Sequence, residues 1–526
     1  MAGLNSLRGA GRPRPCAAPP RPGFIAARPG LIGALLLGLP ATAAAHGFGR
    51  LYTLPVPFWL YAWGAASTLL LSFLLVGLLA GRGAPAAPGR NAEQAGARPA
   101  ERPLRPCGPR ARGLLRLAQG LALGALLLAI ATALFGNRDP YRNFSMVAFW
   151  VVFALGLPYL SALLGNVYAR LNPWRTLAIV LAAPTGRLGR WGWAYLRGRW
   201  RWPAGLAEWP ALALYLGFVW YELFAAGRPG SLGRLLLAYT LLNLAAVGAF
   251  GLRAWFARGE FFGLLLRLYG LLAPLAIRGP QEPGARLALR RPLQGLVDAR
   301  AGSAALLLFA LAMLSTTAFD GLRATQTWVA LYWADPFGAV EAVLGSRPMA
   351  QPGPARSLYL LWESAWLLAS PLLYALPYLA CVAAAKALTR SQRPLRALAL
   401  DFGLTLLPIA LAYHAAHYAT LLLADGMKIL SLLSDPFGRG WDLFGTAWQF
   451  RQPILPPVAW VWHGQVGLIL AGHVASVYVA HRVALRVFGS RGAALRSQLP
   501  MLAYMVLLTI VGLWILSQPL TAERMM

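Results

Sequence analysis

Two histidines stand three residues apart in an otherwise apolar stretch, "AYHAAHYATLLLADG", at residues 412–426. Residues three apart on an α-helix lie on one face, so His414 and His417 can present two imidazoles to one ion. A histidine or carboxylate from another helix would complete the set of ligands. A divalent metal with an open position polarises a phosphoryl oxygen and lowers the pKa of bound water. The spacing therefore predicts a metal site suited to hydrolysis.

Other ionisable residues occur inside apolar segments, where such side chains usually face the interior of a helix bundle or a wet cavity. Asp320, in "STTAFDGLRATQ", is the carboxylate that we expect as a metal ligand or general base. We expect His473 as the third histidine ligand, and His463 as a catalytic group that faces the substrate or supports the ligands. Further members of an intramembrane polar network are Glu222, Glu363, Asp401 and His481.

Three other interpretations use the same residues. His414 and His417 can hydrogen-bond to neighbouring helices without doing any chemistry. A haem iron between one of them and His473 is a less favoured cofactor than a divalent metal. Asp401 with His481 suits a structural pair or a proton relay better than a catalytic dyad.

The elements that position these residues are predicted to be transmembrane helices. Of the 526 residues, 58% are hydrophobic and 12% are charged, which is more apolar than a soluble protein. A helix needs about 20 apolar residues to cross the hydrocarbon core, where the backbone must satisfy its own hydrogen bonds. We therefore predict an all-α fold, a polytopic bundle in the lipid bilayer. Ten segments have the required length, at about residues 58–80, 114–135, 146–168, 208–226, 234–256, 301–319, 358–385, 398–424, 458–481 and 498–518.

The net charge of +31 is explained by topology rather than by nucleic-acid binding, because the basic residues gather between the apolar segments. Every second connection is basic, and this set holds about 29 Lys and Arg against about 11 in the others. This bias places the basic set in the cytoplasm, and the mature N-terminus and the C-terminus outside. The eighth and ninth segments are then antiparallel, with His414, His417 and the outer part of the ninth segment in the same half of the bilayer. The basic connections are 81–113, 169–207, 257–300, 386–397 and 482–497.

Residues 1–45 are predicted to be a signal peptide, or else an uncleaved anchor, ahead of a membrane domain at 46–526. Several arginines precede the apolar stretch "LIGALLLGLPATAAA", which ends in small residues just before His46. After cleavage, the amine and imidazole of His46 can chelate copper, but the neighbouring residues offer no second ligand. Residues 81–113, rich in Pro, Gly, Ala and Arg, are predicted to be a disordered cytoplasmic loop.

Two connections on the outer side, 320–357 and 425–457, are predicted to be ordered. They contain the similar sequences "ADPFGAVEAVLG" and "SDPFGRGWDLFG". In each, Asp precedes Pro, which is typical of a helix N-cap followed by the first helical position.

Several stretches resemble the bacterial integral-membrane proteins of the fenitrothion hydrolase family. They are spread from residue 45 to about residue 482, and so cover most of the chain. The resemblance implies a bacterial inner-membrane enzyme that hydrolyses an organophosphorus triester, a small molecule, at a P–O–aryl bond. The stretches are "AHGFGRLYTLPVPFWLYAWGAA", "NPWR", "STTAFDGL", "YHAAHY", "SDPFGRGWDLFGTA" and "GHVASVYVAHR".

Two classes of function follow from these residues. The first is a metal-assisted phosphotriester hydrolase whose His and carboxylate site opens to the outer face. The second is a membrane transporter, or a protein that handles metal or haem, in which the same polar residues line a path. Asp401 and His481 would extend such a path to the inner side, which a one-sided hydrolase does not need.

Overall fold

The computed structural model describes residues 57–79, 102–103, 109–183, 189–225, 227–278, 286–450, 452–453 and 456–518. The predicted signal segment, His46 and most of the linker 81–113 lie outside these residues. All described residues belong to one unit that begins at residue 43.

The fold is all-α, as the sequence predicted, and the described residues include nine helices long and apolar enough to cross a membrane. The one predicted segment outside this set, 208–226, forms α9 (Trp209–Ala225), an apolar helix of 17 residues. Two of the nine are interrupted runs, Phe144–Leu164 and Leu395–Asp425. The others are α2 (Phe58–Leu79), α3 (Pro109–Phe135), α10 (Pro229–Phe250), α14 (Ala304–Arg323), α17 (Pro352–Thr389), α21 (Val458–Phe488) and α22 (Arg491–Ser517).

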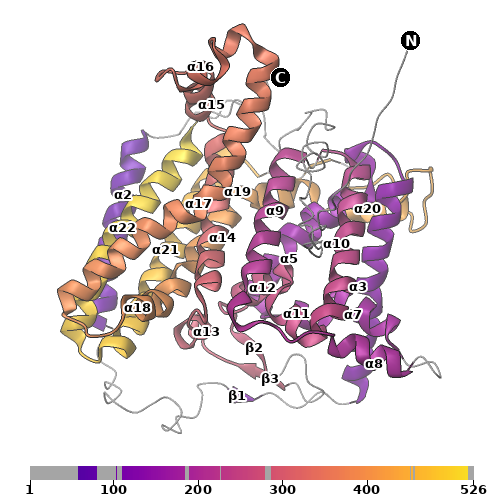
Figure 1. Ribbon diagram of the computed structural model, residues 1–526, viewed down its shortest axis with the longest axis horizontal. Coiled ribbons are helices and arrows are strands. Elements are labelled where there is room, and N and C mark those ends of the chain that lie inside the picture. The colour runs from indigo at the N-terminus through magenta and orange to yellow at the C-terminus, as the bar shows by residue number, and fades with distance from the viewer. Residues whose placement is uncertain are drawn as a thin grey trace, which may run out of the picture. The chain divides into compact units, whose positions relative to one another are not determined.

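Helix α14 lies at the centre of the packing (Figure 1). Its most apolar stretch is 83% buried, whereas the corresponding stretches of α2 and α3 are 22% buried. Helices α9, α17 and α22 pack around it, together with α19 (Leu407–Asp425). Two of its polar side chains form hydrogen bonds with neighbouring helices: Ser315 bonds to Ser370, and Thr316 bonds to Tyr215. The central helix is thus both buried and polar near its C-terminal half.

Helices α19 and α21 pack against each other, as expected for the eighth and ninth segments. A Cβ atom added at Gly472 would lie 2.3 Å from the Cβ of Ala412 and 2.8 Å from the carbonyl oxygen of Pro408. Only glycine therefore allows the two helix backbones to come this close.

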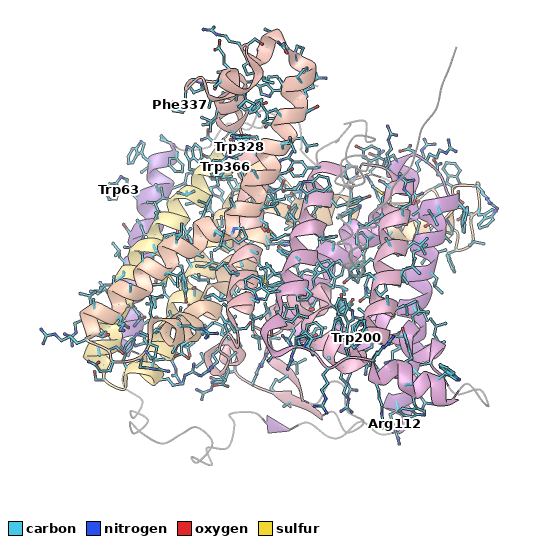
Figure 2. The ribbon with its side chains drawn as sticks, in the orientation of Figure 1. Trp63, Arg112, Trp200, Trp328, Phe337 and Trp366 are labelled. Carbon is cyan, nitrogen blue, oxygen red and sulfur yellow. The ribbon has the colours of Figure 1, made fainter. Side chains whose placement is uncertain are left out.

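The two ends of the bundle differ (Figure 1). One end carries α15 (Gln326–Trp333), α16 (Ala339–Leu344) and η6 (Pro348–Ala350). The opposite end carries a small antiparallel sheet, ordered β1-β3-β2. Figure 2 shows Trp328 and Trp366 toward the first end and Arg112 and Trp200 toward the second, as expected for interfacial residues. The strands are β1 (Arg102–Pro103), β2 (Leu275–Arg278) and β3 (Arg286–Leu289).

The sequence analysis predicted no strands, yet β2 begins within the apolar stretch at residues 260–277. Helix α12 (Phe261–Tyr269) covers only the first half of that segment, and most of its side chains are buried. Gly270 follows its last turn and Pro274 lies just before β2, so the chain cannot continue as one helix.

The two Asp-Pro-Phe-Gly loops are turns, which corrects the predicted placement of Pro at a first helical position. The carboxylate of Asp335 accepts hydrogen bonds from the backbone N–H of Val340 and Glu341, at 3.1 and 2.8 Å. The carboxylate of Asp435 accepts from Arg439 and Gly440 in the same way, at 2.9 and 2.8 Å. Because the glycine of each loop has a positive φ, the chain turns back on the carboxylate before any helix begins.

Candidate functional site

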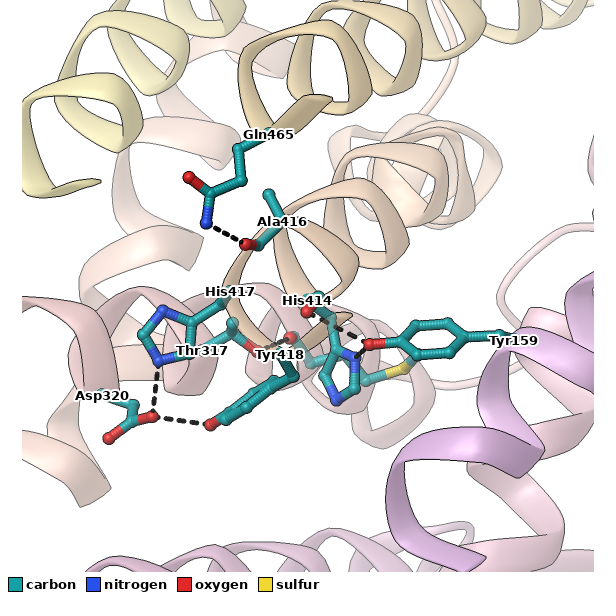
Figure 3. Close-up of polar contacts among 9 residues, drawn as sticks. Tyr159, Thr317, Asp320, His414, Ala416, His417, Tyr418 and Gln465 are labelled. Carbon is teal, nitrogen blue, oxygen red and sulfur yellow. Dashed lines mark hydrogen bonds and ion pairs between the residues drawn. The ribbon is translucent and has the colours of Figure 1, made fainter. Parts of the chain in front are cut away.

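The polar site is centred on Asp320, near the C-terminal end of α14. One carboxylate oxygen, Oδ2, lies 2.9 Å from Nε2 of His417 and accepts a 2.6 Å hydrogen bond from the hydroxyl of Tyr418. Both partners come from α19, and Figure 3 shows them converging on the same oxygen. Adjacent residues on a helix point about 100° apart, so two long side chains can reach one atom between them.

A glycine allows this approach. Gly321 follows Asp320, and a Cβ atom there would lie 2.8 Å from Cγ2 of Ile515 and 3.7 Å from Cε1 of His417. The absence of a side chain lets α22 and the His417 ring pack against this turn of α14.

His414 has a different partner from His417. Its Nδ1 lies 3.0 Å from the hydroxyl of Tyr159, which also lies 3.3 Å from the His414 carbonyl oxygen. Tyr159 belongs to α5 (Leu157–Leu164), which directly continues the π-helix η3 (Val147–Gly156). Figure 3 shows the His414 ring directed at Tyr159 and the His417 ring directed at Asp320. The two histidines therefore do not act as one bidentate pair.

An ion pair lies one turn from Asp320. Arg323 donates to both carboxylate oxygens of Glu363, at 3.3 and 3.2 Å, and its guanidinium lies 4.9 Å from the ring centroid of Phe224. The side chain of Glu363 is 4% exposed and that of Arg323 is 17% exposed. Arg323 also interacts electrostatically with Asp320, so positive charge is held beside the site.

Glu222, on α9, is a second carboxylate close to Asp320. It interacts electrostatically with Asp320 and Tyr418. No hydrogen bond or ion pair joins its carboxylate to another described residue. We call Asp320, His417, Tyr418, Glu222 and the Arg323–Glu363 pair the Asp320 site.

An aromatic cluster borders the Asp320 site. Phe319 precedes Asp320 and packs edge-on against Trp328, with ring centroids 5.5 Å apart. Trp328 in turn lies 4.4 Å from Trp362, which precedes Glu363. The cluster is Phe319, Trp328, Tyr359, Trp362 and Trp366.

The Asp320 site is not sealed. The side chains of His417 and Asp320 are 22% and 18% exposed. Part of the surface of both side chains is therefore uncovered by the protein.

The predicted set of metal ligands does not assemble in the described part of the chain. His473 is 2% exposed, and its Nδ1 lies 2.8 Å from the carbonyl oxygen of Ile469 on its own helix. Its neighbour Gly472 faces α19, so the His473 side chain points about 100° away from that contact. Among the described residues, no group of three or more His, Cys, Asp or Glu is placed to hold a metal. Catalytic metals usually have three protein ligands, so these residues do not fit the predicted centre.

His473, His414 and His417, the histidines of the haem alternative, each have another partner in the structure: the Ile469 carbonyl oxygen, Tyr159 and Asp320.

His463 is exposed and has no described contact with the Asp320 site. Gln465, two residues further on, faces α19 instead, and its Nε2 donates to the carbonyl oxygen of Ala416 at 2.8 Å. Residues two apart on a helix point about 200° apart, so both cannot face the same neighbour. The spacing of Gln465, Ile469 and Gly472 marks the packed face, and the sequence analysis did not use it.

Asp401 and His481 do not pair with each other. Asp401, in α18 (Leu395–Phe402), forms an ion pair with Arg393 at 2.9 Å. His481 is fully buried, and its Nδ1 lies 3.0 Å from the side-chain amide of Gln498. Arg393 lies in the turn just before α18, whereas Gln498 lies on α22, so Asp401 and His481 form no dyad.

Three residues that contact predicted site residues were not predicted from the sequence. Tyr418 follows His417, Arg323 lies one turn beyond Asp320, and Tyr159 is far away in sequence. The first two share a helix with a predicted residue and could have been found by spacing, whereas Tyr159 could not.

The fold defines an integral membrane protein of the all-α polytopic class. No protein-family model, no curated protein and no solved structure matches the chain. The geometry of the Asp320 site therefore carries the functional argument.

Proposed function

We propose that this protein is a membrane hydrolase that cleaves a small aryl ester at the Asp320 site. The substrate class is the organophosphorus triester implied by the family resemblance. The observation that carries the proposal is the His417–Asp320 contact at 2.9 Å, between two side chains that are partly exposed.

The contact orients His417 as a general base. The carboxylate of Asp320 accepts from Nε2–H, which leaves the lone pair on Nδ1 of His417. No described residue hydrogen-bonds to that Nδ1. A water molecule bound there can give it a proton while the water oxygen forms a bond to phosphorus.

The remaining bond changes and proton transfers need only the bound water and the side chains of the protein. As the new P–O bond forms, the bond to the aryl oxygen breaks with its electron pair, and the aryl oxide takes the proton from the His417 imidazolium. The products are a phosphodiester and a phenol. The Asp320 carboxylate stabilises the imidazolium, and the nearby Arg323 favours the charged form of that carboxylate.

The surroundings of the site suit an aryl substrate. The aromatic cluster offers ring faces for an aryl group, beginning at Phe319, which is next to Asp320. The site lies near the end of α14 that leads to α15 and α16, which the charge bias places on the outer side of a bacterial inner membrane. A triester carries no net charge and can reach this depth from the membrane interface.

Turnover of a 4-nitrophenyl phosphotriester by the detergent-purified protein tests the proposal. We expect His417→Gln to lower kcat by about 10²- to 10⁴-fold, the usual contribution of a general base. Asp298→Asn is the control, because Asp298 is exposed and lies outside the site. Parent protein that does not exceed the buffer rate would contradict the proposal, and so would His417→Gln with parental turnover.

A chelator arm tests the predicted divalent metal directly. If a chelator abolishes turnover and added divalent metal restores it, the metal-free mechanism above is wrong, and a divalent metal takes part in the reaction.

A second function, proton-coupled transport, is favoured by one observation. Glu222 has no polar partner among the described residues, yet interacts with Asp320, and such a carboxylate can exchange a proton. Proton uptake into proteoliposomes that depends on Glu222, without any ester hydrolysis, would favour this function over the first.

A further inference from the structure

A cavity of about 100 Å³ lies away from the Asp320 site. It is lined by parts of α6 (Tyr168–Leu171), α7 (Pro173–Leu181), α11 (Leu252–Arg258) and α12. A single water needs about 10–15 Å³ by a comparable measure, so the cavity has room for a polyatomic ion. Its polar lining includes Asn166, Tyr168, Asn172, Arg175 and Arg267.

The cavity carries an excess of positive charge. Arg175 and Arg267 line it, and Arg170 and Arg253 are close enough to Arg175 to repel it. Burial, together with these two arginines, lowers the pKa of Arg175. None of the four forms an ion pair with a carboxylate within the described ranges. Nη1 of Arg267 donates to the carbonyl oxygen of Ala257 at 3.1 Å, which leaves its positive charge without a counter-ion. A concentration of guanidinium groups without ion pairs is expected to be stabilised by an anion.

Two carboxylates lie nearby, and each is already bound by other groups. Glu260 accepts hydrogen bonds from Tyr239, Asn172 and the backbone N–H groups of Phe262 and Gly263. Glu208 accepts from Ser303, and it also interacts electrostatically with Arg267. Four guanidinium groups against two occupied carboxylates leave net positive charge at the cavity.

An unsatisfied donor also lines the cavity. Tyr168 is 4% exposed, and its buried hydroxyl has no hydrogen-bond partner among the described residues. Burial, and the charge of Glu260, raise its pKa, so the hydroxyl stays protonated and can donate. A buried hydroxyl without a partner is costly unless something else accepts its hydrogen bond.

We propose that this cavity binds a phosphate group through Arg175, Arg267 and Tyr168. Guanidinium groups form paired hydrogen bonds with phosphate oxygens, and a group with several negative oxygens can use more than one arginine at once. The phosphate is either free orthophosphate or the headgroup of an anionic lipid. Both sources are available on the basic side of the bundle, where the cavity lies. The inference does not depend on hydrolysis at the Asp320 site.

Thermal unfolding in a maltoside detergent, which contains no phosphate, separates the two sources. One arm titrates inorganic phosphate against chloride at equal ionic strength, and the other adds phosphatidylglycerol to the micelles. We expect a rise in Tm in at least one arm. A rise with inorganic phosphate alone identifies free phosphate, and a rise with lipid alone identifies a headgroup.

Arginine variants in the cavity, compared with arginine variants at exposed positions, test whether the rise in Tm comes from binding in the cavity. The double variant Arg175→Gln, Arg267→Gln is expected to weaken the apparent affinity at least about tenfold, because each loses a charge-assisted hydrogen bond. Arg291→Gln, Arg300→Gln removes the same charge from exposed positions and is expected to keep the affinity.

Tyr168→Phe provides a second test in case the double arginine variant does not fold. This substitution removes only the hydroxyl group, and it should also weaken phosphate binding. The proposal is wrong if neither arm raises Tm in the parent, or if Tyr168→Phe and the arginine variants leave the affinity unchanged.

Discussion

Two regions of the bundle use the same residue types in different ways. In the Asp320 site, an aspartate and a histidine from neighbouring helices are in direct contact at 2.9 Å. In the other region, Asp401 and His481 turn to Arg393 and Gln498 instead. An acidic residue and a histidine at similar depth are therefore not enough to make a dyad, because the helix faces must also converge.

The difference also bears on function. A path across the membrane needs polar groups linked from one side to the other, whereas a one-sided enzyme needs only one cluster. The contacts of Asp401 and His481 with separate partners fit a stabilising role.

Asp320→Asn and Asp401→Asn should separate the two regions by activity. Asp320→Asn no longer holds the imidazolium of His417, so we expect aryl phosphotriester turnover to fall by about 10²- to 10⁴-fold. Asp401→Asn should retain parental turnover in detergent, measured at equal amounts of folded protein. Equal losses in both variants would mean that the two regions function as one path.

Glu363→Gln should destabilise the protein more than Asp401→Asn. It removes the ion-pair partner of the largely buried guanidinium of Arg323, which costs about 3–5 kcal/mol. Arg393 is 41% exposed and can be solvated, so the loss of Asp401 should cost about 1 kcal/mol. Denaturant unfolding in micelles measures both, and a larger loss for Asp401→Asn would reverse the comparison.

Two carboxylates outside the spans should give stability opposite dependences on pH. Burial raises the pKa of Glu260 to about 7, although its hydrogen bonds lower it. The folded state then binds the proton more tightly than the unfolded state, so stability is highest below about pH 4.5 and falls by about 3 kcal/mol by pH 7. Glu260→Gln should remove this slope from the profile of Tm against pH.

Asp442 should show the opposite slope. Hydrogen bonds from the Ala447 backbone and Ser434 lower its pKa, so the stability that they give is present near neutral pH and is lost as the pH falls. Asp442→Asn should flatten the acid side of the profile, and an unchanged acid side would show that these bonds do not contribute.

Tyr418→Phe and Tyr159→Phe should differ slightly, because the first hydroxyl bonds to a carboxylate and the second to His414. We expect a loss of about 1.5–3 kcal/mol of stability for Tyr418→Phe and about 1 kcal/mol for Tyr159→Phe. Equal losses would indicate that the charge of Asp320 adds nothing to the Tyr418 bond.

The class of fold follows from the amino-acid sequence alone. Apolar segments of about 20 residues must form helices in a bilayer, because a backbone in lipid can satisfy its hydrogen bonds only internally. Among the predicted segments, only 208–226 forms a helix shorter than this length, because its described helix, α9, has 17 residues. The sequence also singled out Asp320 and His417, because an ionisable residue in an apolar helix is costly and therefore rare.

Which of these residues come into contact depends on how the helices pack against one another. Rotation of each helix about its axis is set by packing, such as the contact of Gly472 with Ala412, and a turn of about 100° moves a side chain to another neighbour. This rotation separates His473 from His417 and brings Gln465, rather than His463, to α19. The partners Tyr159 and Glu363 lie on helices far away in sequence, so no spacing within one segment can reveal them.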